Sequence, residues 1–110
     1  MNSSLDDLGI ISAFLEHLEI EAIPRALAIK AEVDSGEKIN ELDLLFFDEQ
    51  LLEISNILHL LDRHPEYQGV AVRMVTLYHE ITDKALQNQL LEADDRRFEE
   101  LLIKIRRWQS

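Results

Sequence analysis

A long apolar stretch between Asn40 and Pro65 constrains the fold of this chain more than any other feature. Its apolar side chains recur at intervals of three and four residues, the spacing that places them on one face of an α-helix. The residues of this face are Leu44, Phe47, Leu51, Ile54, Leu58 and Leu61. A second apolar face carries Leu45, Phe46, Leu52 and Ile57. A helix that is apolar around so much of its circumference is normally central, so we expect a central helix over residues 40–63.

Four further helical patterns surround this stretch, at approximately residues 4–22, 24–35, 65–91 and 95–108. Pro24 is expected to start a new helix because proline is best tolerated in the first turn; a kink within one helix is the alternative. Gly36 and Pro65 indicate short connectors, and Asn40 with Asp43 forms a typical helix start. No run alternates as a strand would. The sequence therefore predicts an all-α fold, a single domain over residues 1–110 that forms an up-and-down bundle of four to five helices without a sheet.

The charge of the chain is strongly uneven. The formal net charge is -11, and residues 1–62 alone hold 14 acidic and 3 basic residues. Such a surface argues against nucleic acid and anionic membranes as partners, and it permits a basic protein partner. Solubility is the plainer role of the same acids. With no cysteine, an acidic start and no long apolar run, we expect a cytoplasmic protein without a signal peptide or a membrane span.

The usual patterns of catalytic sites are missing from the sequence. Its three glycines lie far apart, which excludes a glycine-rich phosphate loop. Di-iron bundles carry a glutamate three residues before a histidine, and none of the four histidines in this sequence has a carboxylate at that position. His79 and Asp83 lie one helical turn apart and form a candidate metal-binding pair, as do His17 and Glu21. Two ligands do not make a site, so solvated helix faces are the plainer interpretation and no cofactor is expected.

The connector after the central helix is a second candidate site. Arg63, His64 and Tyr67 lie close together there, next to the first turn of the helix that Pro65 opens. Backbone amides at a helix start attract anions, so this cluster is where a small ligand would bind. A purely structural role of the same residues is the simpler interpretation.

Excess apolar surface indicates contacts with another protein. A domain of 110 residues has few helices to cover both faces of a central helix, and an uncovered apolar stripe is normally an interface. The candidate interface residues are Leu42, Leu45, Phe46, Leu52, Phe98, Leu101, Ile105 and Trp108. The last four belong to a C-terminal amphipathic helix that either folds back on its own bundle or pairs with a second copy.

These observations favour a non-enzymatic helical protein-interaction module, similar in character to an adaptor or chaperone. We expect it to bind a protein partner or itself through apolar helix faces, with a homodimer as the first expectation. One alternative is an acidic decoy that occupies a basic DNA-binding protein. Another is a bundle that binds a metal or small ligand, including an enzyme.

Overall fold

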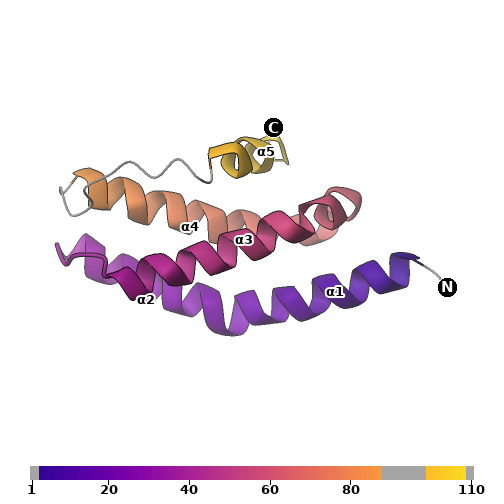
Figure 1. The fold of residues 1–110 in the computed structure, drawn as a ribbon, viewed down its shortest axis with the longest axis horizontal. Coiled ribbons are helices and arrows are strands. Elements are labelled where there is room, and N and C mark those ends of the chain that lie inside the picture. The colour runs from indigo at the N-terminus through magenta and orange to yellow at the C-terminus, as the bar shows by residue number, and fades with distance from the viewer. Residues whose placement is uncertain (1–2, 88–98, 109–110) are drawn as a thin grey trace.

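The computed structural model describes residues 3–87 and 99–108, and it confirms the all-α fold. Three long helical segments lie side by side in alternating directions, with a short fourth one over them (Figure 1). In these two ranges every regular element is helical. The elements are α1 (Ser3–His17), a π-helical turn (Leu18–Ala22), α2 (Ile23–Asp34), α3 (Glu41–Arg63), a 3-10 turn (Pro65–Tyr67), α4 (Gln68–Gln87) and α5 (Glu99–Trp108).

The first two helices form one continuous rod, where the sequence predicts a separate helix from Pro24 onward. The residues at the junctions, His17, Ala22 and Ile23, all have right-handed helical dihedral angles. The amide of Ile23 bonds the carbonyl of Leu18, which is the wide spacing of a π-turn. In a regular α-helix the ring of Pro24 would clash with the carbonyl four residues earlier. The wider π-turn next to it lets the rod continue without a break.

The connector between α2 and α3 has the helix end at Gly36 and the helix start at Asn40 that the sequence predicts. Gly36 has a φ of 97°, a left-handed conformation that favours glycine, and its amide bonds the carbonyl of Val33 at 3.0 Å. Asn40 then caps α3, because its side-chain oxygen accepts a hydrogen bond of 2.8 Å from the amide of Asp43. The rod and α3 are therefore joined by a short, well-defined turn.

The core lies between the rod, α3 and α4. Phe47, Leu51, Ile54 and Leu61 of α3 are fully buried, as their spacing predicts, and the ring of Phe47 packs against Tyr78 of α4 at 5.5 Å. Helix α5 folds back on the same chain and buries Leu101 and Ile105. Among the described helices, none combines the length and the apolar character needed to cross a membrane.

Candidate functional site

An open groove runs between α1 and α3. It has a volume of about 600 Å³ and is lined by Ile10, Ala13, Phe14, His17, Glu53, Asn56 and Ile57. Phe14 and Ile57 are half-buried and pack against the core, whereas Ile10 is 51% exposed. The groove thus has an apolar floor that is continuous with the core and open to solvent. We call these seven residues the α1–α3 groove.

One end of the groove is a small polar network at the π-turn. His17 Nδ1 lies 3.0 Å from Glu21 Oε2, and His17 Nε2 lies 3.0 Å from Gln50 Oε1. A protonated imidazole donates both hydrogen bonds, whereas a neutral one donates one and requires the Gln50 amide to donate the other. The predicted pair of His17 and Glu21 is therefore joined directly, and Gln50, buried on α3, completes the network. This network fixes the seam between α1 and α3.

Three of the predicted interface residues form an exposed row on α3. Leu42, Leu45 and Leu52 are 70%, 53% and 55% exposed. They are three and seven residues apart, so they share one face of the helix. We call these three residues the leucine stripe. Asn56, one turn after Leu52, lines the α1–α3 groove, so the leucine stripe and the groove are neighbouring parts of one surface.

The other predicted interface residues lie elsewhere. Phe46 is buried against Phe47, with the guanidinium of Arg25 4.3 Å from its ring centre. Leu101 and Ile105 are buried in the chain's own core. Trp108 is half-buried, and its indole nitrogen donates a 2.8 Å hydrogen bond to Asp62. The four are thus not available to a partner in this conformation, apart from the exposed part of Trp108. Phe98 lies outside the described residues.

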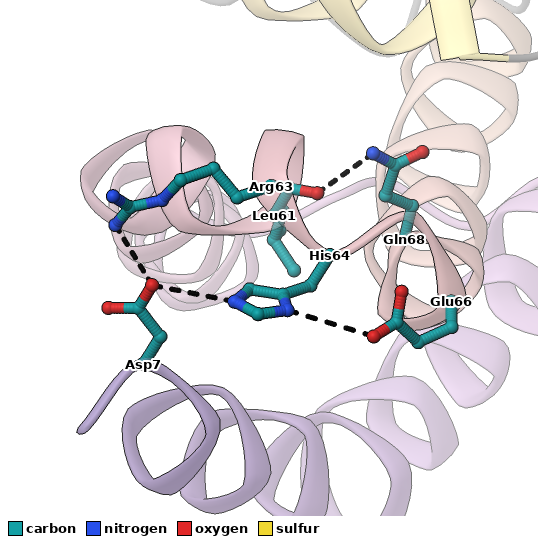
Figure 2. A network of polar contacts seen from close by, with 6 residues as sticks. All are labelled: Asp7, Leu61, Arg63, His64, Glu66 and Gln68. Atoms are coloured by element: carbon teal, nitrogen blue, oxygen red, sulfur yellow. Dashed lines mark hydrogen bonds and ion pairs between the residues drawn. The ribbon is translucent and has the colours of Figure 1, made fainter. Parts of the chain in front are cut away.

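The connector cluster forms around Asp7, an aspartate of α1 that lies far from the connector in the sequence. Figure 2 shows Asp7 of α1 pointing at Arg63 and His64, which lie at the end of α3. Asp7 Oδ2 lies 2.9 Å from Arg63 Nη2 and 3.4 Å from His64 Nε2. On the other side of the ring, His64 Nδ1 lies 3.7 Å from Glu66 Oε1. The ring of Tyr67 is further away, with 6.4 Å between its centre and that of His64.

This geometry makes the cluster an internal anchor. Arg63, the side chain predicted to attract an anion, and His64 beside it both face a carboxylate of the same chain. The side chains of Asp7 and His64 are 12% and 15% exposed, so this pairing is shielded from water. An external anion would have to displace Asp7. The cluster therefore joins the beginning of α1 to the end of α3.

The predicted pair of His79 and Asp83 lies on the exposed side of α4. Asp83 accepts a 3.1 Å hydrogen bond from Gln87, one turn further along the helix. Across residues 3–87 and 99–108, no three potential ligands of the His, Cys, Asp or Glu type come together. The two residues thus have no third ligand from the described part of the chain.

Sequence reasoning missed the groove because its walls come from segments about 40 residues apart. Two polar residues could have indicated it. Asp7 precedes Ile11 and Leu18 on the buried face of α1, and Gln50 lies one turn after Phe46 and one turn before Ile54 on a buried face of α3. Polar groups at buried positions require polar partners, which here come from another helix.

Comparisons with protein-family models, with curated proteins and with solved structures give no match for this chain.

Proposed function

We propose that this chain is a non-enzymatic helical protein-interaction module that binds a helix of another protein through the leucine stripe. The observation that supports this most is the exposure of Leu42, Leu45 and Leu52, each above half, on the helix that also supplies the centre of the core. Single exposed leucines are ordinary on protein surfaces. Three on one helix face, next to an apolar groove, form the kind of patch that protein partners cover.

The contacts that the histidine and arginine side chains already make within the chain support a non-enzymatic role. His17, Arg63 and His64 are the groups with the best positions for acid–base or anion chemistry, and each contacts a carboxylate of its own chain. A general acid or base has to reach a substrate atom within hydrogen-bond distance. In this arrangement the three side chains instead connect α1, α3 and the π-turn.

Self-association through the leucine stripe is a second version of the same function. Leu42, Leu45, Glu49 and Leu52 follow intervals of three and four residues, which is the pattern of a coiled-coil seam. Glu49 lies in the middle of that seam. In a parallel two-fold pair it would face its own copy, and like charges across an interface are unfavourable. We therefore favour a different protein over a second copy.

Native mass spectrometry of the assembly purified from its own host tests the proposal. We expect the mass of the 12.8 kDa chain together with a protein partner. In a variant with Leu45→Ser and Leu52→Ser the partner should be lost, because both side chains are exposed and their change removes contacts without emptying the core. The matched control is Leu27→Ser, since Leu27 is 42% exposed on α2 and lies outside the stripe.

The outcomes separate the versions of the function. A partner that is retained in the leucine-stripe variant, or lost equally in the control, would contradict the proposal. A homodimer that dissociates only in the leucine-stripe variant would establish the self-associating version. A partner released by salt but unaffected by the leucine substitutions would instead support the acidic decoy.

A further inference from the structure

The surface between the leucine stripe and the α1–α3 groove carries two acids. Glu49 follows Leu45 by four residues and precedes Leu52 by three, so it lies within the stripe. Glu53 follows Glu49 by four residues and lines the groove. Both side chains are exposed, and the described part of the chain offers neither of them a cation. A partner that covers the apolar residues must therefore also cover two carboxylates.

Two of the three basic residues of the first half are engaged elsewhere, and the third, Lys38, lies in the connector before α3. Arg25 lies 4.0 Å from Asp43 and stacks on Phe46, and Lys30 bonds Asp34 at 2.8 Å. Residues 1–62 carry 14 acids against 3 bases, so this surface has a negative field that its own cations do not cancel. A second copy would bring the same acidic surface. A partner with lysine or arginine beside its apolar residues would match it.

The chain itself already packs one amphipathic helix, α5, against the bundle. Helix α5 buries Leu101 and Ile105 in the core, where it packs against α4, and its Lys104 and Arg107 line a pocket together with residues of α3. The indole of Trp108 donates to Asp62 of α3 at 2.8 Å. α5 is thus an amphipathic helix with basic residues late in its sequence, held by apolar contacts and one acid of α3. The exposed face of α3 likewise combines apolar residues with acids, namely the leucine stripe with Glu49 and Glu53.

We infer that the ligand of this surface is a basic amphipathic helix of a partner protein. Its apolar side chains enter the α1–α3 groove and cover the leucine stripe, and its lysine or arginine side chains pair with Glu49 and Glu53. This is the helix-in-groove mode of recognition, in which apolar anchors recur every three or four residues. The inference rests on the proposed function and adds the chemistry of the partner.

A pair of synthetic peptides tests this inference. The probe is a helix of about 18 residues, or five turns, with leucine at intervals of three and four and lysine at the remaining positions. The counterpart keeps every leucine and replaces lysine with glutamate. Chemical-shift mapping on the ¹⁵N-labelled chain should show the lysine peptide at the α1–α3 groove and the leucine stripe. The glutamate peptide should not bind there, because its charge repels the two carboxylates.

Charge-neutral variants give the quantitative test. Glu49→Gln and Glu53→Gln should each lower the affinity for the lysine peptide by roughly two- to fivefold, the range for exposed ion pairs. Each should also make that affinity less dependent on salt concentration. The matched controls are Glu32→Gln and Glu37→Gln, which each remove one negative charge from an exposed position away from the groove. Ile10→Ser, at an exposed position on the groove wall, should weaken binding as well.

Several results would overturn the inference. They are equal binding of both peptides, shifts confined to the neighbourhood of α5, or the same loss of affinity in the control as in the Glu49 and Glu53 variants. The proposed function would survive these results, since the native-assembly experiment tests the leucine stripe without any assumption about charge. Conversely, if the leucine-stripe variant retained its native partner, the proposed function would fail even if the lysine peptide bound as expected.

Discussion

Asp7 and His64 lie 57 residues apart in the sequence, yet Asp7 Oδ2 and His64 Nε2 are 3.4 Å apart. Arg63 reaches the same oxygen at 2.9 Å, so one carboxylate near the start of the chain holds two consecutive residues at the end of α3 (Figure 2). Both elements meet the connector to α4 at this end of the bundle. Because the two residues belong to different elements, their contact fixes the beginning of α1 relative to the end of α3.

Replacing Asp7 with alanine should lower the free energy of unfolding by about 1 to 3 kcal/mol. The loss comes mainly from His64, which is 15% exposed and would keep no partner on that side of its ring, while the more exposed Arg63 can return to water. Urea denaturation measures the change. The matched control is Asp6→Ala, because Asp6 is an exposed acid in the first turn of the same helix. Equal effects of the two substitutions would mean that the anchor contributes nothing.

Alanine substitutions at neighbouring leucines on α3 should differ widely in their effect on the free energy of unfolding. Leu51→Ala empties a fully buried site and should cost about 2 to 5 kcal/mol. Leu58 is half-buried, so its substitution should cost less than that of Leu51. Leu52→Ala, at 55% exposure, should change the stability by about 0.5 kcal/mol or less. Thermal and urea unfolding of the three variants measure these changes in stability. If Leu52→Ala were as destabilising as Leu51→Ala, the core would have to lie elsewhere.

Lys30 should titrate above its ordinary range. The hydrogen bond that Lys30 donates to Asp34 and the negative charge of that residue raise the pKa of Lys30 above its ordinary 10.5, with a smaller contribution from Glu80. Because the folded-state pKa is raised, the pair stabilises the fold fully below pH 10.5, and this contribution is lost as the pH rises through the raised value. An NMR titration of the Lys30 side chain should show a lower pKa in Asp34→Asn. An unchanged titration in that variant would contradict the prediction, and Glu32→Gln is the control.

Salt should raise the melting temperature of the chain. A net charge of -11 repels itself in the compact state, and the Debye length falls from about 30 Å at 0.01 M salt to about 8 Å at 0.15 M. A variant with Glu19→Lys and Glu37→Lys, both at exposed positions, should have a weaker salt dependence. Calorimetry in sodium chloride measures both. A melting temperature that falls with salt would show that attractive ion pairs, rather than repulsion, dominate.

The parts of the fold that could be predicted from the sequence are those with local causes. Asn40 caps α3, Gly36 ends the preceding helix, and the buried row from Phe47 to Leu61 follows from helical spacing alone. The same geometry separates Leu45 from Phe46, because consecutive residues point about 100° apart on a helix. One of these two neighbours is exposed and the other is buried.

The parts that could not be predicted depend on contacts between distant segments. Pro24 is compatible with a new helix, a kink or a π-turn, and the choice depends on how the residues on both sides pack. The partner of His64 could not be chosen among 14 acids in the first half without knowing that α1 lies beside α3. The groove has the same origin, since each of its walls is an ordinary helix face in isolation.

The seam between the rod and α3 is held at both of its ends, and this has a consequence for binding. At one end Asp7 joins Arg63 and His64, and at the other Arg25 reaches Asp43. The α1–α3 groove lies between these two attachments, so its walls keep their separation before any ligand arrives. A preformed surface loses little conformational entropy on association. The conformational-entropy cost of binding should therefore fall mainly on the incoming helix, which becomes ordered as it binds.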